Sequence, residues 1–141
     1  MNDHASSTEA DRSQQILGTS PEEQAALIME AGQLHLGRAI QALDLNDLSA
    51  ATRSYIRVSA AIQEATLRLD LEGGGELAHN LAKLYDWWKQ EIMAASRTKD
   101  THRLAAVAQS MGEIRQTWVQ LHEMKVGTTG ASTPQPGKPV A

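Results

Sequence analysis

The residues of this chain whose types could support catalysis or ligand binding are a group of aromatic side chains and five histidines. The sequence LYDWW, residues 84–88, has three aromatic residues in four positions, and only Tyr55 and Trp118 are aromatic elsewhere. Such a group could be core, line a cofactor site or contact a partner. The histidines lack the His-x-x-x-His spacing of a metal site, and the repeated Glu-x-x-His motifs of a di-iron bundle are absent. Because Cys is also absent, thiolate ligands and thiol catalysis are excluded. The sequence therefore indicates no catalytic residue, cofactor or metal site.

Two further motifs have a functional and a structural interpretation. The glycines at 73–75 follow no predicted strand and lack the Lys-Ser/Thr of a phosphate-binding loop, so they indicate a helix–helix turn. His79 lies opposite the apolar residues of its predicted helix, which predicts an exposed side chain. The run HNLAK is similar to the site of phosphotransfer bundles, although Ala82 and Lys83 stand where Lys and Gly would be expected. An ordinary surface histidine is the simpler interpretation, and a histidine phosphotransfer-type bundle using His79 is the alternative function.

Composition narrows the class of protein. The formal net charge of −4 and a pI near 5.7 argue against a nucleic-acid-binding protein, which would show a basic face. The N-terminus lacks the basic and apolar regions of a signal peptide. No apolar run approaches the length of about 20 residues that a helix needs to cross a bilayer. We therefore expect a soluble cytoplasmic protein without membrane insertion.

Both ends of the chain differ in composition from its centre. Residues 1–15 are predicted to be a disordered N-terminal arm, and residues 126–141 a disordered tail rich in Gly, Thr, Pro and Ser. Residues 16–125 form the predicted folded domain. Three residues predict the start of its first helix. Ser20 is the N-cap, Pro21 stands at the first helical position, and Glu23 completes a capping box with Ser20.

Three further helices are predicted in this domain. The second follows Asn46 or Asp47, the third begins near Glu76, and the fourth follows Asp100 as its N-cap. Helices of about 20–25 residues with short connections should pack as an antiparallel bundle. The predicted fold is all-α: an antiparallel four-helix bundle with a short N-terminal segment packed on it and disordered termini.

Helical geometry predicts that the residues of LYDWW lie on different sides of their helix. At about 100° per residue, Leu84 and Trp88 lie roughly 40° apart on one apolar stripe. This stripe also contains Leu77, and Tyr85 falls at its margin. Trp87 falls well away from the centre of the stripe. It is predicted to be either a lid over a neighbouring helix or a contact for a partner.

The second helix carries more apolar surface than a bundle needs. Ile56, Ala60 and Leu67, together with Gln63, form a second apolar stripe. By helical geometry this second stripe lies roughly 130–170° around the helix from the stripe that faces the core. The fourth helix has a line of small residues, Ala105, Ala108 and Gly112, that would let another helix approach. The N-terminal segment with Ile16 and Leu17 could cover these surfaces in a self-contained five-helix packing, or a partner helix could occupy them.

Three stretches of the sequence form a specific pattern: the opening residues 19–23, LDLEGGGELAHNLAKLYDWW, and EIRQTWVQL in the fourth helix. Across about residues 16–121, this pattern resembles the FliS family of flagellar secretion chaperones. The matched positions of the two longer motifs are Leu69, Glu72, Gly74, Gly75, Glu76, Leu77, Ala78, Asn80, Leu81, Leu84, Tyr85, Asp86, Arg115 and Trp118. The first helix departs from the family: Met29 and His35 stand where aromatic residues are common, and the usual N-terminal Tyr is missing.

The resemblance implies a non-enzymatic chaperone in the cytosol. It would bind the C-terminal helical segment of flagellin, prevent premature polymerisation and assist delivery to the type III export apparatus. The resemblance also implies that the N-terminal segment covers part of the binding surface until flagellin arrives. The export gate and flagellar regulators are further candidate partners, and self-association of the bundle is a third hypothesis. The predicted partner-binding residues are Ile16, Leu17, Ile56, Ala60, Leu67, Trp87, Ala105, Ala108 and Gly112.

Overall fold

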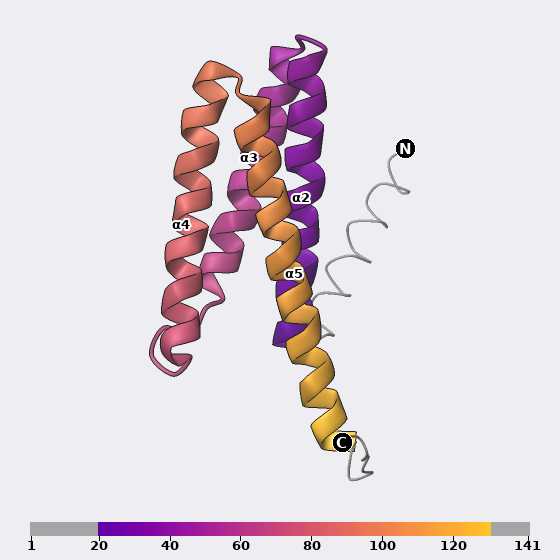
Figure 1. Cartoon of the computed structure of the whole chain (residues 1–141), viewed down its shortest axis with the longest axis vertical. Coiled ribbons are helices and arrows are strands. Elements are labelled where there is room, and N and C mark those ends of the chain that lie inside the picture. Colours follow the sequence, from indigo (N-terminus) through magenta and orange to yellow (C-terminus); the bar gives the residue numbers. More distant parts are fainter. Residues whose placement is uncertain (1–19, 131–141) are drawn as a thin grey trace, which may run out of the picture.

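The described part of the chain, residues 20–130, forms an antiparallel bundle of four helices (Figure 1). The computed structural model describes the backbone of residues 20–130 and the side chains of residues 20–127. The helices are α2 (Pro21–Asp44), α3 (Leu48–Leu67), α4 (Gly75–Thr98) and α5 (Thr101–Gly130). The predicted all-α four-helix architecture is confirmed. The predicted N-terminal arm, with Ile16 and Leu17, lies outside the described residues. Helix α5 ends at Gly130, beyond the predicted end of the domain at 125.

The predicted helix starts are present with their hydrogen bonds. The Ser20 Oγ accepts a hydrogen bond from the Glu23 backbone N–H at 3.1 Å, and the Glu23 Oε1 accepts one from the Ser20 N–H at 3.1 Å. This capping box satisfies two donors that would otherwise be unpaired at the start of α2. Asp47 caps α3 by accepting from Ala50 N–H, and Asp100 caps α5 by accepting from Arg103 N–H. Each cap of this kind stabilises a helix by about 1 kcal/mol.

The glycine run connects α3 to α4, as predicted. The Asp70 carbonyl accepts the Gly74 N–H at 2.7 Å, and the Asp70 Oδ1 accepts the Gly73 N–H at 2.9 Å. A Cβ on Gly74 would clash with the Asp70 carbonyl oxygen. Gly75 has a positive φ, in the left-handed region that only glycine adopts at low cost. These two glycines therefore make the tight turn that returns the chain along α4.

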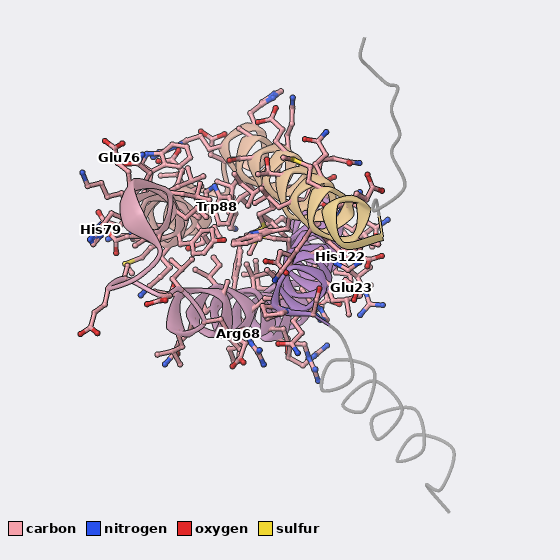
Figure 2. All side chains as sticks on the ribbon, turned by 90° about the horizontal axis from the view of Figure 1, so that it is seen from below. Glu23, Arg68, Glu76, His79, Trp88 and His122 are labelled. Carbon is pink, nitrogen blue, oxygen red and sulfur yellow. The ribbon has the colours of Figure 1, made fainter. Side chains whose placement is uncertain are left out.

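The core lies where the inner faces of all four helices meet. Helix α2 packs along both α3 and α5, whereas α4 completes the bundle with smaller contacts to α5 and α3 (Figure 1). Figure 2 shows Trp88 directed into this interior from α4. The largest fully buried side chains are Trp88, Tyr85, Met29, Leu36, Ile62, Leu104, Met111, Val58 and Val107.

The position of Tyr85 corrects the predicted register of α4. Tyr85 is fully buried and stacks on Trp88 with ring centroids 5.0 Å apart, whereas Leu84 is only partly buried and Leu77 is 47% exposed. The buried stripe is therefore rotated by a few tens of degrees from the predicted one. The reason is tertiary: α4 contacts α3 and α5, and α5 supplies hydrogen-bond partners for both buried aromatic residues.

Candidate partner-binding surface

Helix α3 presents an apolar stripe to solvent. We call Ile56, Ala60 and Leu67 the α3 stripe; all three are exposed, with Ile56 at 64% and Leu67 at 72%. Val58 and Ile62 on the opposite side of the helix are fully buried. The helix is thus apolar on two faces, and only one of them contributes to the described core. Exposed apolar surface of this kind commonly marks an interaction site.

A second apolar feature is a groove at the end of the bundle where α2 begins and the α3–α4 turn lies. We call it the α4–α5 groove; its volume is about 610 Å³. Its apolar lining comes mainly from α4 and α5, and charged side chains line it as well. The apolar lining is Leu69, Leu77, Ala78, Leu81, Trp118, Leu121 and Met124, and the charged residues are Glu22, Arg68, Asp70 and Lys125.

Two aromatic hydrogen bonds fix the relation of α4 to α5. Trp118 Nε1 donates to Tyr85 Oη at 3.2 Å, and Trp88 Nε1 donates to Ser110 Oγ at 2.9 Å. Burial raises the pKa of Tyr85, and the hydrogen bond from Trp118 opposes that rise only in part. The tyrosine therefore stays neutral near pH 7. Because both indole N–H groups are paired, these large rings can be buried without leaving a donor unsatisfied.

Polar contacts join the start of α2 to the last turns of α5. Ser20 Oγ and His122 Nδ1 are hydrogen-bonded at 2.9 Å, and His122 Nε2 lies 3.5 Å from Glu23 Oε2. Figure 2 shows Glu23 and His122 side by side. Lys125 Nζ lies 3.2 Å from Glu22 Oε2. Partial burial acts to raise the pKa of Glu22, but a backbone hydrogen bond and Lys125 outweigh it, so this pKa is below its ordinary value.

The predicted binding residues of α4 and α5 fall in different environments. Trp87 is 48% exposed, and Ala105 is exposed on α5. Ala108 and Gly112 instead face α2: Gln33 Nε2 donates to the Ala108 carbonyl at 3.0 Å, and a Cβ on Gly112 would lie 2.6 Å from Gln33 Nε2. The small residues at 108 and 112 therefore already accommodate a neighbouring helix of this chain. Whether any of the predicted residues contacts a partner stays a prediction.

Sequence reasoning did not identify the α4–α5 groove. Leu77 was assigned to the core stripe of its helix, whereas the structure places it at the groove with Trp118 and Leu121. The available signal was a run of apolar residues that continues to Met124 near the end of the fourth helix. Its meaning depends on how far α4 and α5 separate, which periodicity alone does not give.

His79 is exposed on the outer side of α4, near Glu76, as the sequence predicted (Figure 2). In residues 20–127, no cluster of three or more His, Asp or Glu side chains is arranged to hold a metal ion. None of the four helices is both long and apolar enough to cross a membrane, considering the described part of the chain. The distinctive surfaces of the described bundle are therefore apolar ones, the α3 stripe and the α4–α5 groove.

These features define an all-α bundle with substantial apolar surface outside its core, and comparison with known proteins gives its family. The family model described as flagellar protein FliS matches residues 4–125. The chain is 25% identical over 107 residues to the flagellar secretion chaperone FliS of Salmonella typhimurium (strain LT2), covering 75% of this chain and 79% of that protein. It is 28% identical over 107 residues to the flagellar secretion chaperone FliSB of Pseudomonas aeruginosa (strain PAO1), covering 74% of this chain and 82% of that protein.

The chain belongs to the FliS family. The resemblance inferred from the sequence motifs is thus confirmed. Membership supports a function as a flagellar secretion chaperone, and chaperones of this kind are not an enzyme class.

Proposed function

We propose that this protein binds the C-terminal helical segment of flagellin in the cytoplasm, prevents its premature polymerisation and assists its delivery to the flagellar type III export apparatus. The observation that supports the proposal most directly is the exposure of the α3 stripe on a helix whose other face is fully used by the core. An amphipathic helix can bury its apolar face on such a stripe. Because the chain belongs to the FliS family, we propose a flagellin segment, and not an unrelated helix, as the bound partner. We call this bound segment the client.

The α4–α5 groove provides a second place for a helical segment. Leu77, Trp118, Leu121 and Met124 offer apolar contacts, and charged side chains also line the groove. The binding role of Trp87 and Ala105 is part of the same proposal. Ile16 and Leu17 would cover part of the apolar surface in the free protein and leave it when flagellin binds.

The test is binding of a flagellin C-terminal segment, measured by calorimetry and by co-purification. We expect a complex with the wild-type protein and a loss of affinity of about tenfold or more for Ile56→Glu and Leu67→Glu, because a carboxylate would be buried against the client. Leu45→Glu is the matched control, since Leu45 is 79% exposed in the α2–α3 turn outside the stripe. Absence of wild-type binding would refute the proposal. Unfolding of the two stripe variants would instead show that the stripe is needed for the fold.

A further inference from the structure

A group of arginines lies beside the α3 stripe, on the side that faces α2. Arg38 of α2 and Arg53 and Arg57 of α3 line one surface cleft of about 290 Å³, together with His35, Ala50 and Ser54. We call the three arginines the basic cluster. Guanidinium groups stay protonated at all physiological pH values, so this small area carries three positive charges. The whole chain has a formal charge of −4, which makes the concentration of positive charge here a local feature.

The basic cluster is not neutralised by the described part of the protein. The ion pairs of residues 20–127 join Arg68 to Glu64, Arg103 to Glu91, and His122 and Lys125 to glutamates of α2, and none includes the cluster. Arg53 donates a hydrogen bond to the neutral Ser49 Oγ. The nearby carboxylate of Asp47 instead accepts the Ala50 N–H as the cap of α3. The cluster can therefore bind carboxylates from another molecule.

The two ends of the α3 stripe consequently differ in charge. Arg53 and Arg57 flank Ile56 within one turn of α3, so the positive charge lies at the N-terminal end of the stripe. At the other end, near Leu67, Arg68 is held by Glu64 at 2.7 Å and donates to Gln24 of α2. A helix lying on the stripe would meet, at one end, arginines without an ion pair to the described residues and, at the other, an arginine already paired with Glu64.

We propose that the basic cluster binds carboxylates at one end of the client helix and thereby sets the direction in which that helix lies on the α3 stripe. The client helix here is the part of the flagellin C-terminal segment that occupies the stripe, so the inference rests on the proposed function. Arginine binds carboxylates through two parallel hydrogen bonds, which adds directional preference to charge attraction. Complementary charge at a rim fixes register and speeds association while the apolar stripe supplies most of the contact.

Affinity is the first test of the basic cluster. The variant Arg38→Gln/Arg53→Gln/Arg57→Gln is compared with a control of equal charge change on α4, Lys83→Gln/Lys89→Gln/Arg97→Gln. Calorimetry with the flagellin C-terminal segment is run at low and at high NaCl concentration. We expect the cluster variant to lose about tenfold in affinity at low salt and most of the salt dependence, because rim ion pairs are individually weak and screened. The control should keep both. Replacing the client's carboxylates by amides should have no further effect on the cluster variant.

Direction is the second test, and it uses the absence of Cys from the chain. Single cysteines at Thr52→Cys and at Leu67→Cys mark the two ends of the stripe. In the presence of an added thiol oxidant, which accepts the two electrons of the new bond, a client segment with one Cys at its more acidic end should form a disulfide with Thr52→Cys and not with Leu67→Cys. The reverse preference, or unchanged affinity and salt dependence in the cluster variant, overturns the inference while leaving the proposed function intact. If the wild-type protein does not bind the segment at all, the proposed function fails and the inference with it. Should the cluster variant not fold, the amide-substituted client and the crosslinks still decide.

Discussion

Trp118 Nε1 donates a hydrogen bond to Tyr85 Oη at 3.2 Å, which joins α5 to α4 at the wall of the α4–α5 groove. Tyr85 is fully buried and stacked on Trp88, so this bond connects the exposed groove to the core. Both residues also belong to the motifs by which the sequence resembles the FliS family. This contact is a structural reason for having both aromatic residues, which are 33 positions apart in the sequence.

Removing either partner of this hydrogen bond should destabilise the protein. Tyr85→Phe leaves the indole N–H without its partner, and Trp118→Phe leaves the hydroxyl without its donor. We expect each variant to lower the free energy of unfolding by about 1–3 kcal/mol. Because the two residues act through one bond, the double variant should lose less than the sum of the single losses. Urea unfolding of the four proteins measures this coupling. Strictly additive losses would show that the bond contributes nothing to stability.

The close approach at Gly74, in the turn between α3 and α4, can be tested by comparing two Gly→Ala substitutions. Gly74→Ala should lower the free energy of unfolding by about 1–3 kcal/mol, because its Cβ clashes with the Asp70 backbone. Gly37→Ala places the same methyl group in open space on the exposed side of α2 and should raise stability by about 0.5–1 kcal/mol. Urea unfolding at one pH compares the two variants. Equal effects of the two substitutions would contradict the close approach described at Gly74.

Sequence periodicity predicted the existence of the four helices. Capping residues predicted helix starts at Ser20, at Asn46 or Asp47, and at Asp100, because caps depend on residues within one turn of each other. Periodicity placed Leu84 in the core and Tyr85 at the margin of the core, whereas Tyr85 is fully buried and Leu84 only partly. The two candidate stripes there differ by only a few tens of degrees, and the choice depends on hydrogen-bond partners on α5 that are distant in sequence. The exposed α3 stripe was predictable because a helix with two apolar faces exceeds what one core requires. The basic cluster was not identified, since it forms only when α2 brings Arg38 beside α3.

The contact between Glu22 and Lys125 predicts a pH dependence of stability. The pKa of Glu22 is lowered in the folded protein, so the folded state binds this proton less readily than the unfolded state does. The stabilisation is therefore present above the ordinary glutamate pKa of about 4.3 and is lost as the pH falls through the lower folded value. Because the pair is solvent-screened, we expect Glu22→Gln to cost no more than about 1 kcal/mol at pH 7.

Urea unfolding of wild type and Glu22→Gln at pH 7 and pH 3 tests this dependence. The stability difference between the two proteins should shrink at pH 3, below the ordinary glutamate pKa, because the unfolded wild-type chain then binds the Glu22 proton more readily than the folded protein does. Glu113→Gln is the matched control, because Glu113 of α5 is exposed and forms no ion pair among the described residues. A Glu22→Gln difference that stays constant between the two pH values would show that the ion pair does not contribute.

The adjacent tryptophans of LYDWW should differ in mutational effect: Trp88 mainly in stability and Trp87 mainly in binding. Trp88 is fully buried, stacks on Tyr85 and donates to Ser110. Trp88→Ala should therefore lower the free energy of unfolding by about 3–5 kcal/mol. Trp87 is half exposed on the surface of α4. Trp87→Ala should cost about 1 kcal/mol or less. If Trp87 contacts the client as proposed, the same variant should bind the flagellin segment several-fold more weakly while its thermal unfolding stays close to wild type. Wild-type affinity in a stable Trp87→Ala protein would remove Trp87 from the proposed binding surface.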